Sequence, residues 1–173
     1  KMDIQLKINV KIFQKYKLNG MLKNVFDGSP YKAIDLVYEN EFKPWEFGNT
    51  RSNYWNDETL ALAVRWLVEE KLHFTVDDIV SKLDQELFAR NGLGGIFQNF
   101  FKGSPYLAIN LAYPGKYKPW QFRRTKTNYW NSQTCTIAIK WLVEEKLNLF
   151  ARDEFELTKE DFKRNGLYGM LIK

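Results

Sequence analysis

The sequence has almost none of the side chains on which disulfide frameworks and zinc sites depend. Cys135 is the only cysteine and His73 the only histidine among 173 residues. A disulfide needs a pair of cysteines and a structural zinc site about four Cys or His ligands, so one chain can form neither. No apolar run reaches the roughly 18 residues of a membrane-spanning helix, and no secretory signal pattern is present. We therefore expect a cytoplasmic protein with no membrane contact, no metal and no cofactor.

What the chain does contain is one segment in two copies. Residues 28–72 and 103–147 align without a gap at an offset of 75, and 26 of the 45 aligned positions are identical. All six tryptophans fall into repeat-equivalent pairs, which are Trp45 with Trp120, Trp55 with Trp130, and Trp66 with Trp141. Self-similarity at a fixed period indicates a tandem-repeat architecture.

A short turn motif occurs three times outside the duplicated segment. It is KLNGML at residues 17–22, GLGGIF at 92–97 and GLYGML at 166–171. A glycine in the left-handed conformation commonly ends a helix, so each motif predicts a turn between two helices, and the pairs resemble helix-turn-helix units. We expect the second glycine of each motif to permit close approach of the two helices. The third occurrence lies at the end of the sequence and predicts the opening of a third repeat.

Several further elements follow from capping signals and hydrophobic periodicity. Asn56 and Asn131 are good N-caps for a long helix in each copy. A connection of about seventeen residues, rich in tryptophan, tyrosine and phenylalanine, precedes each long helix, and its aromatic content predicts that it packs on itself. We also expect a helix over residues 1–16 and another over residues 75–88.

The pattern as a whole predicts an all-α protein made of two tandem helical repeats of about 75 residues and a partial third. We place the first repeat at residues 1–75, the second at 76–150, and the partial repeat or C-terminal cap at 151–173.

No residue pattern predicts catalysis. Glu69 and Glu70, with their counterparts Glu144 and Glu145, are adjacent along a helix and do not face one another, so a solvated helix surface explains them better than an acid–base pair. His73 is best explained as a surface residue, and no nucleophile–base set, P-loop or dinucleotide motif is present. We expect a protein that is not an enzyme, with no evident small-molecule substrate.

The tryptophans could stack nucleobases, but they occur in both copies although the copies differ in charge. Residues 28–72 carry a net charge of −3 and residues 103–147 a net charge of +5. Aromatic side chains shared by an acidic and a basic copy are what a common core requires. We therefore predict that the tryptophans are core residues.

The clearest functional signal is a basic loop in the second copy. It comprises Lys116, Lys118, Arg123, Arg124 and Lys126. The first copy has only Lys43 and Arg51 in the matching loop, with Gly48 and Asn49 in place of the two adjacent arginines. Several cations on one surface gain affinity for phosphates by releasing counterions. A solvated loop, or a loop that pairs with the acidic copy, explains the same residues equally well.

The motifs GL-x-G, GSPY-x-A, YP, KPW-x-F, YW and WLVEEKL together resemble a bacterial family of tandem-repeat domains of unknown function. The resemblance covers nearly the whole chain. It implies a helical repeat domain without enzymatic activity, and it transfers no catalytic residue. The first copy departs from the family pattern at Glu39, where the second copy has Pro114.

Two hypotheses about function follow. The first is a nucleic-acid-binding module, for DNA more than RNA, that contacts phosphates through the basic loop. The second is a protein-interaction scaffold whose acidic and basic copies contact different partners or stack head to tail with another chain.

Overall fold

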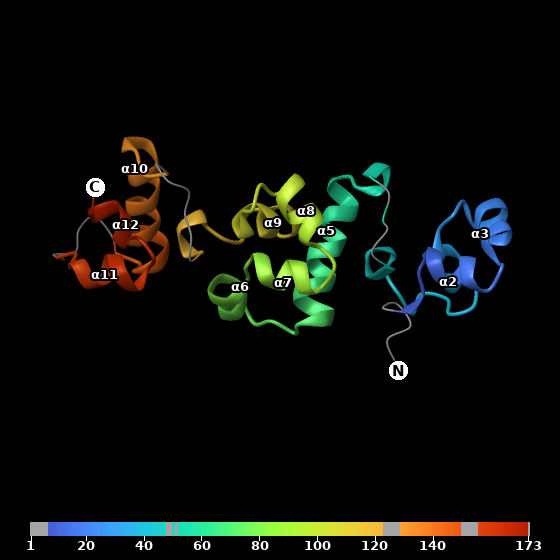
Figure 1. Ribbon diagram of the computed structural model, residues 1–173. Helices are drawn as coiled ribbons and strands as arrows, with labels where there is room; N and C mark the ends of the chain where they lie inside the picture. The colour runs from blue at the N-terminus through green and yellow to red at the C-terminus, as the bar shows by residue number, and fades with distance from the viewer. Residues whose placement is uncertain (1–6, 48–49, 51, 123–128, 150–155, 173) are drawn as a thin grey trace. The chain divides into compact units, whose positions relative to one another are not determined.

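The computed structural model describes residues 7–47, 50, 52–122, 129–149 and 156–172. Over these residues the chain is helical and contains no strand, so the predicted all-α class is confirmed (Figure 1). The chain divides into two compact units. Unit 1 comprises residues 1–73 and 84–112, and unit 2 comprises residues 74–83 and 113–173. No helix among the described residues is both long enough and apolar enough to cross a membrane.

Unit 1 begins with three short helices, α2 (Val10–Lys15), α3 (Asn19–Phe26) and α4 (Pro30–Asp35). Asn9 caps α2, and Ser29 caps α4 by accepting a hydrogen bond of 3.3 Å from the backbone N–H of Lys32. The small core of these helices is formed by Phe13, Leu22 and Ala33. The helix predicted over residues 1–16 is confirmed at α2 but does not run through Ile8 and Asn9, because Asn9 is an extended N-cap. Residues 1–6 lie outside the described part.

The predicted caps of the long helices are confirmed. Asn56 begins α5 (Asp57–Arg65), and its side chain and that of Thr59 each accept a 2.9 Å hydrogen bond from the other's backbone N–H. Asn131 and Thr134 do the same at the start of α10 (Ser132–Lys140). Such a reciprocal capping box satisfies two N–H groups that the helix itself leaves unpaired.

Both long helices change their winding at the same repeat position. α5 continues as the π-helical segment η3 (Trp66–Lys71), and α10 continues as η5 (Trp141–Lys146). Each segment ends before a residue with positive φ, at His73 and at Asn148. A π-helical turn is uncommon, so its presence in both copies indicates that the WLVEEKL sequence specifies it.

The rest of unit 1 consists of α7 (Gln85–Arg90), α8 (Gly94–Asn99) and α9 (Pro105–Ala112). α9 packs along α5, the most extensive helix–helix contact in the described residues. Arg65 anchors this contact because its Nε and Nη2 donate to the carbonyl oxygen of Ala112 over 3.0 and 2.7 Å.

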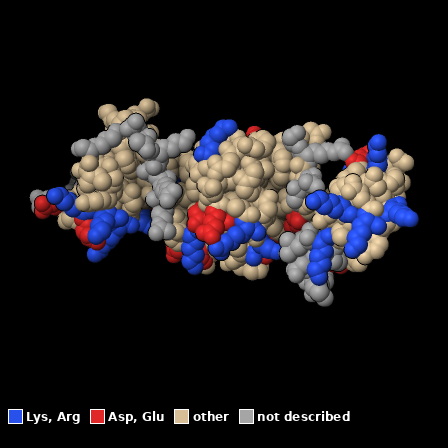
Figure 2. Space-filling model, viewed as in Figure 1, with Lys and Arg blue, Asp and Glu red and all other residues tan. Residues whose placement is uncertain are grey.

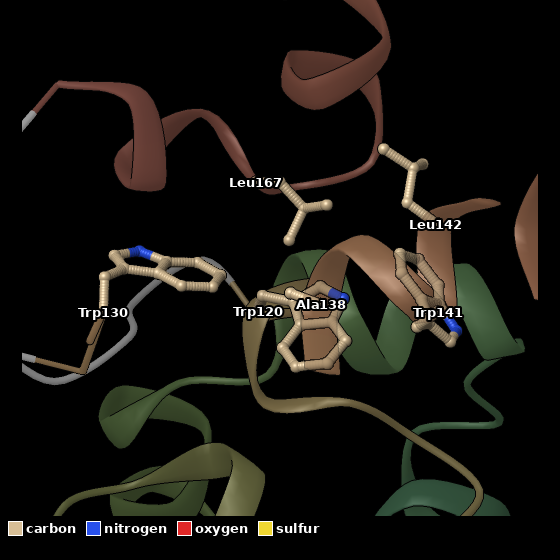
Figure 3. Close-up of a cluster of buried hydrophobic side chains, with 6 residues drawn as sticks. All are labelled: Trp120, Trp130, Ala138, Trp141, Leu142 and Leu167. Carbon is tan, nitrogen blue, oxygen red and sulfur yellow. The ribbon is translucent and has the colours of Figure 1, made fainter. Parts of the chain in front are cut away.

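Unit 2 combines α6 (Val76–Lys82), α10 and η5 with the last two helices, α11 (Lys159–Arg164) and α12 (Tyr168–Leu171). Its core is a cluster of six buried side chains, drawn in Figure 3, which are Trp120, Trp130, Ala138, Trp141, Leu142 and Leu167. Leu167, from the turn before α12, lies over the tryptophans, so the turn motif contributes the last side chain of this core (Figure 3).

One predicted helix is wrong. Residues 75–88 form two helices, α6 and α7, because the backbone at Leu83 is extended. Asp84 then caps α7 by accepting a 3.0 Å hydrogen bond from the N–H of Leu87. An aspartate can cap a new helix as readily as it can continue an old one, and burial of Leu83 decides between the two.

The aromatic connection packs on itself in both copies, as predicted. It holds the 3₁₀ turns η1 (Pro44–Phe47) and η2 (Ser52–Tyr54) in the first copy and η4 (Pro119–Gln121) in the second. The Trp45 ring centroid lies 6.1 Å from that of Trp55 and 5.7 Å from that of Trp66. The equivalent distances from Trp120 to Trp130 and Trp141 are 6.2 and 5.4 Å. Each central indole is thus held between two others.

The first glycine of the turn motif is required by this aromatic connection. Gly92 and Gly166 have φ of +77° and +76°, and a Cβ on either would meet the backbone carbonyl of Trp45 or Trp120. At the equivalent position of the first motif, Lys17 adopts a φ of 59°. The prediction that the second glycine permits close helix approach is wrong for Gly20 and Gly95, where a Cβ would meet nothing within 4 Å. At Gly169 a Cβ would lie 3.0 Å from the indole nitrogen of Trp130, so this glycine permits close approach of a tryptophan side chain.

We predict that Gly166→Ala lowers the free energy of unfolding by about 2 kcal/mol, because the new Cβ would overlap the Trp120 carbonyl in a left-handed backbone. Gly95→Ala is the matched control, since Gly95 is helical, exposed and unobstructed. It should stabilise the protein by about 0.5–1 kcal/mol. Urea denaturation of both variants measures the difference, and equal effects of the two substitutions would contradict the role of the carbonyl.

We also predict a specific loss of stability in acid. The hydrogen bond from Lys82, followed by those from the N–H and hydroxyl of Thr75, lowers the pKa of Asp78 to about 2 from its usual 3.8. A carboxyl with a lowered folded-state pKa contributes stability above the unfolded-state pKa, and this contribution is lost as the pH falls from about 4 to about 2. Asp78→Asn should therefore flatten the pH dependence of the melting temperature in this window. Asp77→Asn is the control, because Asp77 lies outside the capping box, and it should leave the pH dependence of the melting temperature steep.

Candidate nucleic-acid interface

The structure describes two of the five basic loop residues. Lys116 and Lys118 lie in unit 2, between α9 and η4. Arg123, Arg124 and Lys126 lie outside the described residues, so their predicted contact with phosphates stays a prediction.

Lys116 is exposed and lies against aromatic rings. Its Nζ is 5.5 Å from the ring centroid of Tyr113 and 5.8 Å from that of Tyr117. A cation over aromatic faces is held by their quadrupoles but keeps much of its exposure. The first copy has Glu41 at the equivalent position, so this cation belongs to the second copy alone.

Lys118 takes part in an ion pair that both copies share. Its Nζ lies 3.5 Å from Oε2 of Glu145, and the Nζ of Lys43 lies 3.7 Å from Oε2 of Glu70. The predicted exposure of the glutamates is confirmed, but sequence reasoning missed that they hold the aromatic connection to the end of the long helix. Exposed pairs contribute only about 0–1 kcal/mol, so a phosphate could replace Glu145 at little cost in stability.

The prediction that the tryptophans are core residues is confirmed for five of the six. Trp45, Trp66, Trp120, Trp130 and Trp141 are buried, and Trp55 is half-buried. A buried indole has no face free for a nucleobase. These five tryptophans therefore cannot contribute to an interface with nucleic acid by stacking.

Sequence reasoning overlooked a second basic surface, on the α2–α3 helix pair. It carries five exposed lysines, which are Lys7, Lys11, Lys15, Lys17 and Lys23. Residues 7–26 contain no aspartate or glutamate. Figure 2 shows basic side chains gathered over α2 and α3, at the right of the view. The signal was available in the sequence, since residues 1–27 carry a net charge of +4.

The turn of this helix pair is also more open than the other two. Leu18 is 44% exposed, whereas the equivalent Leu93 and Leu167 are fully buried. Leu93 and Leu167 come from turns that the Trp45 and Trp120 carbonyls approach. The leucine of the turn between α2 and α3 thus contacts solvent, whereas the leucines of the other two turns are packed in the core.

Other features of the described residues give no sign of chemistry. They contain no group of three or more His, Cys, Asp or Glu side chains that could hold a metal ion. Unit 1 has a cavity of about 310 Å³ lined by Tyr31, Pro44, Phe47 and Tyr54 among others. Burial raises the pKa of the Tyr31 and Tyr54 hydroxyls, so both are neutral hydrogen-bonding groups at physiological pH. His73 is exposed, as predicted.

Comparison with known proteins finds a match to part of the chain and no activity. The model of a protein family of unknown function (DUF4046) matches residues 44–118. This match fits the expected resemblance to an uncharacterised domain family. The match begins in the KPW motif of the first copy and ends in that of the second. It therefore covers the aromatic connection of the first copy and the helices that follow it, up to the connection of the second copy. No curated protein and no solved structure matches the chain.

The difference between the turns predicts different responses to the same truncation. Leu93→Ala removes a fully buried side chain and should lower the free energy of unfolding by about 2–5 kcal/mol. Leu18→Ala should lower it by less than about 1 kcal/mol, because Leu18 already contacts solvent. Chemical denaturation of the two variants tests this. An equally large effect at Leu18 would mean that its turn is not open.

Proposed function

We propose that this protein is a non-catalytic, cytoplasmic helical repeat module that binds nucleic acid, DNA in preference to RNA. The observation that carries the proposal is the uninterrupted positive charge of the α2–α3 pair, five exposed lysines without a carboxylate in residues 7–26. In this proposal the chain consists of two helical repeats and a partial third, like the tandem-repeat family that its motifs resemble.

The electrostatics of the α2–α3 surface suit a polyanion. Nucleic acid carries a condensed layer of counterions, and each phosphate that a lysine neutralises releases about one of them. Four of the five lysines lie on α2, α3 and the turn between them, and Lys7 lies just before α2, so they can contact several phosphates at once. Affinity should therefore fall steeply with salt, with a slope of about −0.9 in log–log form for each phosphate contact.

The shape of the helix pair supports duplex DNA as the ligand. The second helix of a DNA-binding helix pair contacts base edges while the first lies across the backbone. The exposed face of α3 offers Asn19, Lys23 and Asn24, and asparagine can bond the major-groove edge of adenine in two places. The five buried tryptophans are not available to stack on the bases of a single strand, which favours a duplex.

The basic loop of the second copy is a separate proposed contact with nucleic acid, in unit 2. Lys116, Lys118, Arg123, Arg124 and Lys126 would contact phosphates without reading sequence. Lys118 would exchange the carboxylate of Glu145 for a phosphate. Each surface can be neutralised separately, so their contributions can be measured one at a time.

The test is fluorescence anisotropy with labelled duplex DNA, single-stranded DNA and RNA, titrated from low to physiological salt. The variant Lys11→Gln/Lys15→Gln/Lys23→Gln should weaken duplex binding at least tenfold at low salt and reduce the salt slope by about three. The loop variant Arg123→Gln/Arg124→Gln/Lys126→Gln should act in the same direction.

The matched control is Lys146→Gln/Lys159→Gln/Lys163→Gln, which removes the same charge from exposed lysines of unit 2. It should change affinity less than threefold, because only the general attraction of a basic protein is reduced. Equal weakening by the α2–α3 variant and the control would show that net charge, and no defined surface, accounts for binding. Absence of binding at low salt would overturn the proposal.

A further inference from the structure

The contact between α5 and α9 buries a stripe on each helix. On α5 and η3 the stripe is Leu60, Val64 and Val68, spaced four residues apart and at most 3% exposed. On α9 it is Ala108, Ile109 and Ala112, all fully buried. We call the set on α5 and η3 the insert stripe and the set on α9 the receiving stripe. Because α5 belongs to the first sequence copy and α9 to the second, the contact joins successive copies within unit 1.

The insert stripe of the second copy is uncovered at Ile139, whereas Cys135 packs against the tryptophan cluster of unit 2. Its members are Cys135, Ile139 and Val143, at the repeat-equivalent positions of α10 and η5. Ile139 is 38% exposed where Val64 is 0% exposed, and Cys135 and Val143 are half-buried. The hydrophobic character of the stripe is retained, but nothing in the described residues covers it as α9 covers α5.

The receiving stripe of the first copy is uncovered only at its C-terminal end, since Ala33 is buried in the core with Phe13 and Leu22 and Ile34 is half-buried. It is Ala33, Ile34 and Val37, in α4 and the turn that follows it. Val37 is 70% exposed where Ala112 is 0% exposed, and the adjacent Leu36 is 72% exposed. α4 ends at Asp35, whereas α9 continues through the position equivalent to Val37. Helices this short depend on tertiary packing, so the missing contact accounts for the shorter helix.

We infer that the exposed insert stripe on α10 binds the exposed receiving stripe on α4 of a second copy of this chain, in the geometry of the α5–α9 contact. In that geometry Lys140 takes the place of Arg65 and donates to the carbonyl oxygen of Val37, as Arg65 does to that of Ala112. This self-association is independent of nucleic-acid binding and uses other residues.

Charge differences between the copies favour this occupant. Beside the exposed receiving stripe stand Asp35 and Glu39, where the covered one has Asn110 and Pro114. α10 carries no carboxylate and ends with Lys140, whose Nζ lies 3.9 Å from Glu144 in its own helix. Docking would bring a cationic helix end beside two carboxylates. The two carboxylates are present beside the exposed stripe and absent beside the covered one. Negative charge at this place attracts a basic partner to the exposed stripe.

The inferred contact joins two different surfaces, so it is heterologous. Each dimer still exposes one insert stripe and one receiving stripe, one on each copy, so association continues until a ring closes or the concentration limits it. A single helix-on-helix contact is small by the standard of stable interfaces, about 1,200 Å² and above. We therefore expect dissociation constants of about 10–100 μM, and complexes that grow with concentration.

Sedimentation velocity over a wide concentration range, with no nucleic acid present, tests the inference. Wild type should show a sedimentation coefficient that rises with concentration, and Ile139→Asp or Val37→Asp should hold the protein monomeric. The matched control is Ile137→Asp, because Ile137 is 52% exposed on the same helix and its equivalent, Leu62, stays 48% exposed in the covered copy. All three sites contact solvent, so folding should survive, which circular dichroism verifies.

A mixing experiment identifies the geometry. Val37→Asp retains only an insert stripe and Ile139→Asp only a receiving stripe, so an equimolar mixture should form one-to-one dimers and nothing larger. Failure of the mixture to dimerise would overturn the inference, as would equal effects of Ile137→Asp and Ile139→Asp. A wild type that stays monomeric at millimolar concentration would also overturn it, and would assign the stripes to a different partner.

Discussion

Each unit of this protein depends on the contact between a tryptophan-bearing connection and the turn that lies against it. The backbone carbonyl of Trp120 comes so close to Gly166 that no side chain fits there, and Leu167 then completes the tryptophan cluster. The Trp45 carbonyl and Gly92 have the same relation in unit 1. The aromatic side chains supply most of the buried apolar surface, and the glycine allows the helix pair to reach it. Without this contact the short helices on either side would have little to pack against.

The same contact explains why the helix pairs differ although their sequences are alike. A covered turn has glycine at the left-handed position and a fully buried leucine. The turn between α2 and α3 has Lys17 and a partly exposed leucine instead, and it lies within the most basic stretch of the described chain. Similar turn motifs thus form part of the core where an aromatic connection lies against them. The turn between α2 and α3, which no aromatic connection in the described residues covers, is exposed and charged instead.

Much of this could be predicted from the sequence because the signals are local. Asn56 and Asn131 cap their helices through a partner three residues away, and the repeat-equivalent tryptophans indicate that the two copies share a core. What could not be predicted depends on residues distant in the chain. The break at Leu83 follows from burial, and the pairing of Lys118 with Glu145 needs the connection folded against the helix end. The basic surface on α2 and α3 could not be inferred from a comparison of the copies, because residues 7–26 lie outside the duplicated segment.

The π-helical segments have a consequence for how the duplicated segment tolerates change in length. In η3 and η5 the N–H groups of Leu72 and Leu147 donate to carbonyls five residues earlier, over 3.0 and 2.9 Å. Such a turn holds one residue more than an α-helical turn, so it corresponds to an insertion that the helix absorbed. Deleting one residue from WLVEEK would restore ordinary winding and rotate everything beyond it by about 100°. Glu70 or Glu145 would then point away from its lysine, and the following chain would leave the helix in another direction. These helices can therefore vary in sequence on their exposed faces, but their residue count is fixed.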